Sequence, residues 1–174
     1  MIISQDLNVL EERYPFCEKL NNDIINYLAS QNQNFYELSY KTNVKAKMSS
    51  WTLRSECFTP LCKWIASIFR SKIIYALPEI RFDELWVSKY DHGDFTEPHA
   101  HFPATYSFVY FLNSPKGSSP LVFTQNRKKI KPEEGKVVIF PANVFHHVPK
   151  NKCQNRIVIA GNISIPSAHP ILTL

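Results

Sequence analysis

The sequence predicts an α+β fold that is mainly β, a jelly roll or small barrel with N-terminal helices packed outside it. Two observations point to this class. Apolar residues recur at helical spacing in the first 75 residues, whereas short runs rich in aromatic and β-branched residues follow one another after residue 78. Many short strands after a helical start are typical of a closed or two-layered β architecture with helices on its outer face.

The helical part contains two predicted helices. Leu20, Ile24 and Leu28 lie at helical spacing, which predicts an amphipathic helix over residues 15–30. Thr59 and Pro60 suit a helix start, because proline is tolerated in the first turn. A broad apolar stripe then continues this second helix to about residue 71. Residues 41–51 are polar and aperiodic, so we expect an irregular connection there.

The β part begins near residue 80. Aromatic and β-branched residues predict strands at residues 81–90, 105–112, 121–124, 136–140, 144–148 and 156–165. Turn-forming residues at 113–120 and 132–135 separate some of these strands. No repeat or linker interrupts the chain, so we expect residues 1–174 to form a single domain, with a mainly helical support over 1–75 and a β core over 80–165.

The composition is that of an ordinary globular protein, with 44% hydrophobic and 20% charged residues and a net charge of +5. No apolar run approaches the roughly 20 residues that span a bilayer, and the first residues lack the features of a signal peptide. The four cysteines form no C-x-x-C pair, which favours free thiols. We therefore expect a cytoplasmic protein that does not enter a membrane. The basic run at 127–131 favours a solvated hairpin turn over a nucleic-acid patch, without excluding nucleic acid as a substrate.

Three histidines form the strongest candidate site. His99 and His101 lie two residues apart, which places both imidazoles on one face if the segment is extended. His146 comes from a distant strand, and its neighbour His147 should point to the opposite face. Imidazole ligands on a β scaffold suit iron, manganese, nickel or zinc. Glu97 shares the predicted face of the first two histidines and is a reserve carboxylate ligand.

Arg156 follows the third histidine by ten residues. Its guanidinium is always charged and matches a carboxylate bidentately, so inside a barrel it would anchor an acidic co-substrate. The alternative is a salt bridge on the surface.

Four segments carry a family resemblance: residues 86–101 (WVSKYDHGDFTEPHAH), 107–112 (SFVYFL), 132–149 (PEEGKVVIFPANVFHHVP) and 156–162 (RIVIAGN). They resemble the small 2-oxoglutarate/Fe(II)-dependent oxygenases of bacteria and phages, which are similar to the prolyl-hydroxylase-like branch of that superfamily. The resemblance implies a double-stranded β-helix, also described as a cupin-like jelly roll, with iron at one open end. It implies His99 and His146 as metal ligands and Arg156 as the anchor for the distal carboxylate of 2-oxoglutarate. It also suggests that Tyr90 or Tyr110 assists Arg156, and it places Asn162, at a family-like position, among the residues that bind the co-substrate.

Two positions depart from the superfamily pattern. His101 stands where an aspartate or glutamate is usual, which implies a triad of histidines alone or a carboxylate from elsewhere in the chain. Val158 stands where a serine usually helps to hold the co-substrate.

The resulting prediction is a dioxygenase that uses Fe(II), 2-oxoglutarate and O₂ to hydroxylate an unidentified substrate, which is a small molecule or a protein side chain such as proline. Two alternatives stay open: a cupin-type dioxygenase with a three-histidine metal that does not use 2-oxoglutarate, and a non-catalytic jelly-roll binding module.

Overall fold

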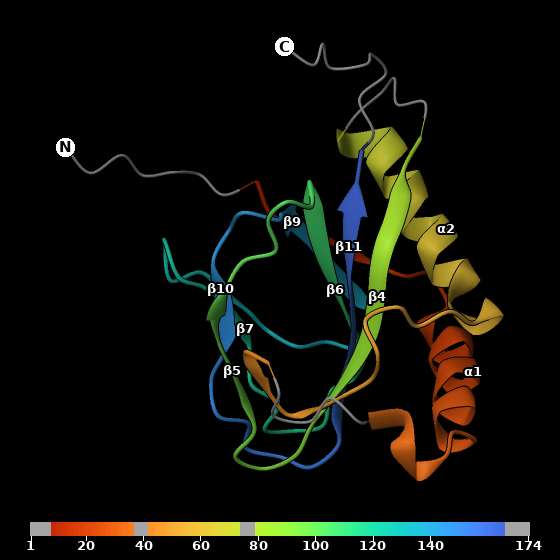
Figure 1. Ribbon diagram of the computed structural model, residues 1–174, viewed down its shortest axis with the longest axis vertical. Coiled ribbons are helices and arrows are strands. Elements are labelled where there is room, and N and C mark those ends of the chain that lie inside the picture. The colour runs from red at the N-terminus through yellow and green to blue at the C-terminus, as the bar shows by residue number, and fades with distance from the viewer. Residues whose placement is uncertain (1–7, 37–41, 74–78, 166–174) are drawn as a thin grey trace.

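Two antiparallel sheets form the centre of the protein. The computed structural model describes residues 8–36, 42–73 and 79–165. The larger sheet has the strand order β1-β9-β6-β11-β4-β3 and the smaller one the order β2-β5-β10-β7-β8. The smaller sheet lies on one side of the larger sheet, and both main helices lie on the other (Figure 1). The strands of the larger sheet are β1 Leu10–Arg13, β3 Lys47–Met48, β4 Arg81–Tyr90, β6 Tyr106–Asn113, β9 Lys136–Pro141 and β11 Arg156–Ser164. Those of the smaller sheet are β2 Val44–Lys45, β5 Phe95–His99, β7 Leu121–Phe123, β8 Lys129–Ile130 and β10 His146–Val148.

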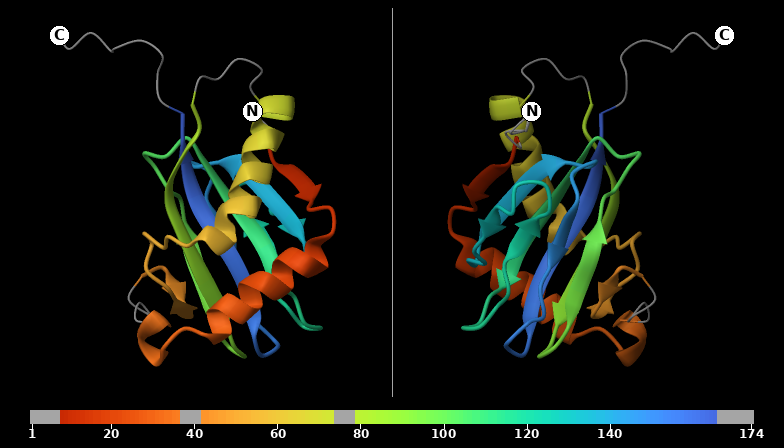
Figure 2. Two further views of the ribbon diagram at one scale, coloured as in Figure 1. Left: turned by 90° about the vertical axis from the view of Figure 1, so that its right-hand side faces the viewer. Right: turned by 90° about the vertical axis from the view of Figure 1, so that its left-hand side faces the viewer.

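The two predicted helices are present and cover the outer face of the larger sheet (Figure 2). Helix α1 spans Cys17–Ala29 and buries the apolar residues that predicted it. Helix α2 spans Thr59–Ile68, with Pro60 in its first turn, and continues as the π-helical turn η3, Phe69–Ile73. Two short 3₁₀ turns complete the helical part, η1 at Gln33–Tyr36 and η2 at Glu56–Phe58. None of the described helices is long and apolar enough to cross a membrane.

The predicted strands are all present, with bounds that differ by at most two residues. Three further strands lie in the part expected to be helical or irregular, namely β1, β2 and β3. Strand β1 extends the larger sheet by pairing with β9. Its sequence, Leu10-Glu11-Glu12-Arg13, contains a single apolar residue, so backbone pairing rather than side-chain alternation forms it. All four cysteines lie in the described residues and are free.

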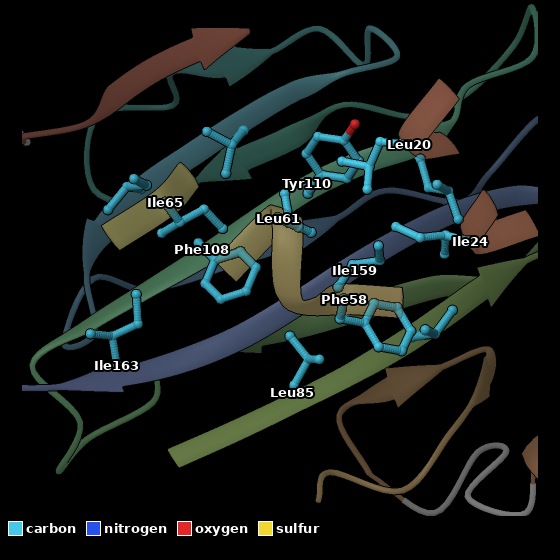
Figure 3. Packing of buried hydrophobic residues seen from close by; sticks show 14 of the residues in the cluster. Leu20, Ile24, Phe58, Leu61, Ile65, Leu85, Phe108, Tyr110, Ile159 and Ile163 are labelled. Atoms are coloured by element: carbon cyan, nitrogen blue, oxygen red, sulfur yellow. The ribbon is translucent and has the colours of Figure 1, made fainter. Parts of the chain in front are cut away.

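The larger sheet separates two apolar clusters. Its outer face packs under both helices, where Leu20, Ile24, Leu61 and Ile65 meet side chains of β4, β6 and β11 (Figure 3). Its inner face meets the smaller sheet around Trp86, Phe111, Phe123, Phe140 and Val158. Alternate residues of one strand therefore enter two different environments. The described strands thus have the two-sheet arrangement expected for a double-stranded β-helix.

Candidate metal centre

His99, His101 and His146 come together at one end of the space between the sheets. Each offers one ligand atom, and the three atoms lie within 4.8 Å of one another. His99 is the last residue of β5 and pairs directly with His146, the first residue of β10. His101 lies beyond the strand, where its backbone N–H donates to the carbonyl of Ala142 over 2.7 Å. His147 is outside the group, as strand alternation predicted.

Backbone carbonyls orient two of the three imidazoles. Nδ1 of His99 lies 2.8 Å from the carbonyl oxygen of Glu97, and Nδ1 of His146 lies 3.0 Å from that of Val144. A carbonyl oxygen only accepts, so each Nδ1 carries the proton and donates. The lone pair of each neutral ring then lies on Nε2, the nitrogen left free to bind a metal.

Burial keeps the cluster in its neutral form. Desolvation lowers the pKa of His146 to about 3, with a further contribution from His99 beside it. Desolvation likewise lowers the pKa of His101 to about 3 and also lowers the pKa of His99. Because a metal ligand must be deprotonated, rings that stay neutral at neutral pH are available to bind a cation.

Glu97 does not belong to this group, so its prediction as a reserve carboxylate ligand was wrong. Strand β5 is irregular at this point: His99 pairs with His146 and Thr96 with Val148, so three residue steps on β5 oppose two on β10. The extra step breaks the alternation on which the prediction depended. Thr96 and His99 point inward, while the side chain of Glu97 is exposed.

Arg156 is the second element of the site. It is 1% exposed and lies among the side chains between the sheets. Its Nε and Nη1 have no hydrogen-bond partner among the described residues. Burial lowers the pKa of Arg156, and Tyr90 partly opposes this effect, yet a guanidinium stays protonated in proteins. A buried charge without an anionic partner is costly, which indicates that a ligand supplies the anion.

The two candidate tyrosines lie on opposite faces of the larger sheet. Tyr90 pairs with Arg156 across β4 and β11, and its ring centroid lies 4.6 Å from the guanidinium carbon. Its hydroxyl is 2.7 Å from Oγ1 of Thr96. Tyr110 instead points toward the helices, where its hydroxyl donates to Oδ1 of Asn21 over 2.6 Å (Figure 3). The suggestion that Tyr110 assists Arg156 was therefore wrong.

A narrow cavity joins the histidine cluster to Arg156. Its walls come from both sheets and include Tyr90, Thr96 and Val158. Ser88 also lines it and lies directly opposite Val158, on the neighbouring strand. Neither Thr96 nor Ser88 was predicted from the sequence as a site residue. The alternation of side chains along β4 could have identified Ser88 as a site residue, because Ser88 and Tyr90 lie on the same face of that strand.

Asn162 lies away from Arg156, in an open cleft on the other side of the histidine cluster. Its Oδ1 accepts a hydrogen bond from Ser107 over 2.8 Å, and its Nδ2 donates to the carboxylate of Glu84. The structure thus assigns its amide to a structural bond network and corrects the expectation that Asn162 contacts the co-substrate. The open cleft has a volume of about 500 Å³, and His99 and His101 form part of its wall.

The residues present fit a divalent metal together with an anionic co-substrate. Three neutral imidazoles form a donor set suited to iron and similar ions. The orphaned guanidinium of Arg156 lines the same cavity and suits a carboxylate. The open cleft reaches the histidines from outside, so a third molecule can approach the same centre.

Comparison with known proteins agrees with this geometry. Residues 85–164 match the family described as the 2OG-Fe(II) oxygenase superfamily, whereas no curated protein matches the sequence. Among solved structures, the chain is similar to the viral collagen prolyl hydroxylase of Paramecium bursaria Chlorella virus-1 in complex with 2OG (TM-score 0.71, 14% identity, 92% of this chain and 98% of that chain). It is similar to a Pseudomonas putida prolyl-4-hydroxylase (TM-score 0.70, 13% identity, 92% of this chain and 94% of that chain). It is also similar to HygX of Streptomyces hygroscopicus with nickel, 2-oxoglutarate and hygromycin B bound (TM-score 0.68, 8% identity, 91% of this chain and 83% of that chain). At these identities the solved structures establish the fold.

Proposed function

We propose that the chain is an Fe(II)- and 2-oxoglutarate-dependent dioxygenase of the 2OG-Fe(II) oxygenase superfamily, the family that residues 85–164 match. In this proposal His99, His101 and His146 hold the iron and Arg156 binds 2-oxoglutarate. One observation supports this assignment most directly. A buried guanidinium with two unbonded nitrogen positions and a cluster of three neutral imidazoles line the same narrow cavity. A dicarboxylate that reaches from Arg156 toward the metal would satisfy both.

When bound, the iron supplies the activation of O₂ that couples decarboxylation of 2-oxoglutarate to hydroxylation of a substrate C–H bond. The protein contributes binding, orientation and exclusion of water. Arg156 fixes the distal carboxylate, and the ring of Tyr90 lies against the guanidinium and restricts its position. Apolar residues from both sheets exclude water from the cavity, among them Val44, Val148 and Val158.

The third histidine changes the charge at the metal. A neutral ligand at position 101, in place of the usual carboxylate, leaves one more positive charge on the metal centre. We expect this to strengthen the binding of the 2-oxoglutarate dianion.

Ser88 supplies the hydroxyl that Val158 lacks. The two residues are directly opposite each other on β4 and β11, and both line the cavity. A hydroxyl on the neighbouring strand can therefore donate to the carboxylate that Arg156 holds. This makes Ser88 a binding residue in the proposal, beside Arg156 and Tyr90.

The substrate enters through the open cleft, which reaches His99 and His101. Two of the similar structures are named as prolyl hydroxylases and one contains hygromycin B. By this likeness we propose that the substrate is a protein side chain, such as proline, or a small molecule.

A three-histidine dioxygenase that does not use 2-oxoglutarate is the second candidate, because all three clustered residues are histidines. An enzyme of this kind would leave the buried Arg156 without an anionic partner, which favours the 2-oxoglutarate-dependent dioxygenase. Oxygen uptake that is independent of 2-oxoglutarate would reverse this order.

The test is an anaerobic titration of the Fe(II)-loaded protein with 2-oxoglutarate, monitored by the visible charge-transfer absorption of the chelate. We expect a band in the wild type that is lost in His99→Ala, His101→Ala and Arg156→Ala. A variant of the exposed Glu97, Glu97→Gln, should retain the band. If the wild type binds iron but shows no band, the second candidate replaces the first. Full binding by Arg156→Ala would overturn the role of Arg156.

A further inference from the structure

The open cleft beside the metal centre has an uneven charge. Among the described residues, its wall contains two carboxylates, Asp83 and Glu84, but no lysine or arginine. The whole chain has a net charge of +5, so the acidic wall contrasts with the rest of the molecule. Asp83 is already paired, because its Oδ1 lies 3.1 Å from Nη2 of Arg81. Glu84 has no ion-pair partner among the described residues.

Neighbouring strands hold the carboxylate of Glu84 in place. Asn162 pairs with Glu84 on one side and with Ser107 on the other, across β4, β11 and β6. Ser107 donates to Asn162, and Asn162 donates to Oε2 of Glu84. Both the oxygen and the nitrogen of the Asn162 side chain therefore have hydrogen-bond partners, and the carboxylate of Glu84 is held through one of its oxygens. The other oxygen, Oε1, has no hydrogen-bond partner among the described residues.

Two exposed aromatic side chains flank the same cleft. Trp51 is 40% exposed and precedes the bridge between Thr52 and Leu85, next to Glu84 on β4. Phe102 is 83% exposed and follows His101. Both belong to the wall of the cleft. Aromatic faces attract organic cations, and they also bind the apolar stem that carries such a cation.

We propose that the substrate carries an ammonium or guanidinium group, which binds Glu84 while its stem packs against Trp51 and Phe102. The inference rests on the proposed function and specifies its substrate class: a basic side chain of a peptide or a small organic amine. A cation at Glu84 compensates the only carboxylate of the described cleft wall that lacks an ion-pair partner. It leaves the rest of the substrate beside His99 and His101, in the same cleft, where the C–H bond to be hydroxylated must lie.

The test measures binding to the full chain by its tryptophan fluorescence, because Trp51 and Trp86 line the cleft. The probes are four peptides, acetyl-Gly-X-Gly-amide, in which X is lysine, arginine, norleucine or glutamate. We expect the lysine or arginine peptide to bind about tenfold more tightly than the norleucine peptide, since a charged hydrogen bond is lost in norleucine. n-Butylammonium serves as a fifth probe: affinity equal to that of the lysine peptide points to a free amine, and weaker affinity points to a peptide.

Glu84→Gln is the decisive variant, because glutamine still accepts the hydrogen bond of Asn162 but lacks the charge. We expect it to remove the preference for the cationic peptides. Glu79→Gln makes the same change of net charge just before β4, outside the cleft, and should keep the preference. Equal binding of the norleucine peptide, binding of none of the peptides at millimolar concentration, or an unchanged preference in Glu84→Gln would overturn the inference.

The two proposals fail in distinguishable ways. The peptide titration needs no metal, so it reports on the cleft alone. The 2-oxoglutarate band, measured on the same Glu84→Gln protein, reports on the inner cavity and should be retained. A missing band in the wild type refutes the proposed function, whereas a retained band without charge preference refutes only the substrate class.

Discussion

Tyr90 and Tyr110 illustrate the difference between the two faces of the larger sheet. Both are buried strand tyrosines, with 3% and 0% of their surface exposed. Tyr110 lies on the helix side, and its hydroxyl is bonded to Asn21. Tyr90 lies on the cavity side, against the unpaired guanidinium of Arg156.

The comparison separates structural polar groups from functional ones. On the helix side, Asn21 donates to the carbonyl of Leu112 over 3.0 Å and accepts from Tyr110, so these polar side chains have partners within the protein. On the cavity side, Nε and Nη1 of Arg156 have none among the described residues. Buried polar groups without partners are rare in proteins and need an explanation. In the proposed function, a bound 2-oxoglutarate supplies the missing partner of Arg156.

The largest expected effect concerns the metal. His146→Ala removes the most buried of the three proposed ligands, so Fe(II) affinity should fall by on the order of a hundredfold or more. His147→Ala removes the adjacent histidine, which is outside the cluster, and should leave the affinity unchanged. Equilibrium dialysis with metal analysis measures both. Equal loss in the two variants would show that the cluster does not bind the metal.

Arg156→Met should separate binding from stability. We expect the affinity for 2-oxoglutarate to fall by about 2–5 kcal/mol, because the anion loses its buried partner. The free energy of unfolding should stay constant or increase, because an unpaired charge is replaced by an apolar side chain of similar length. Ligand titration and denaturant unfolding without ligand measure the two quantities. A large loss of stability would mean that Arg156 has a structural partner.

The two tyrosines give opposite results when each is changed to phenylalanine. Tyr110→Phe leaves Oδ1 of Asn21 without a donor, so the protein should lose about 1–2 kcal/mol of stability and keep its 2-oxoglutarate affinity. Tyr90→Phe should instead weaken 2-oxoglutarate binding several-fold, through the loss of its hydroxyl from the cavity. Thermal unfolding and ligand titration of both variants test this contrast. Identical behaviour of the two would remove the distinction between the faces.

Ser88→Ala should have the smallest effect. The loss of one hydrogen bond weakens 2-oxoglutarate binding by about 1 kcal/mol, or roughly fivefold. Adding Val158→Ser to this variant places a hydroxyl directly opposite position 88 and should restore part of the affinity. Ligand titration of the single and double variants measures the effect. No weakening in Ser88→Ala would exclude Ser88 from the binding site.

Local patterns in the sequence were sufficient for much of the fold and part of the site. The stripes of apolar residues predicted α1 and α2, and the strand prediction for residues 81–90 agrees with β4 at both ends. His99, His101 and His146 were predicted as one group and do lie together. Such patterns are readable because helix and strand periodicity depend on neighbours along the chain.

Tertiary structure decided the remaining site residues. Alternation shows which residues of β6 share a face, but only the packing of the sheets shows that Tyr110 faces the helices. The irregular pairing of β5 with β10 turned Glu97 outward, and pairing across three strands committed Asn162 to Ser107 and Glu84. These outcomes depend on contacts between distant segments, which no local pattern specifies. The sequence by itself therefore determined the chemistry available to the protein, and the pairing of distant strands determined which side chains meet in the site.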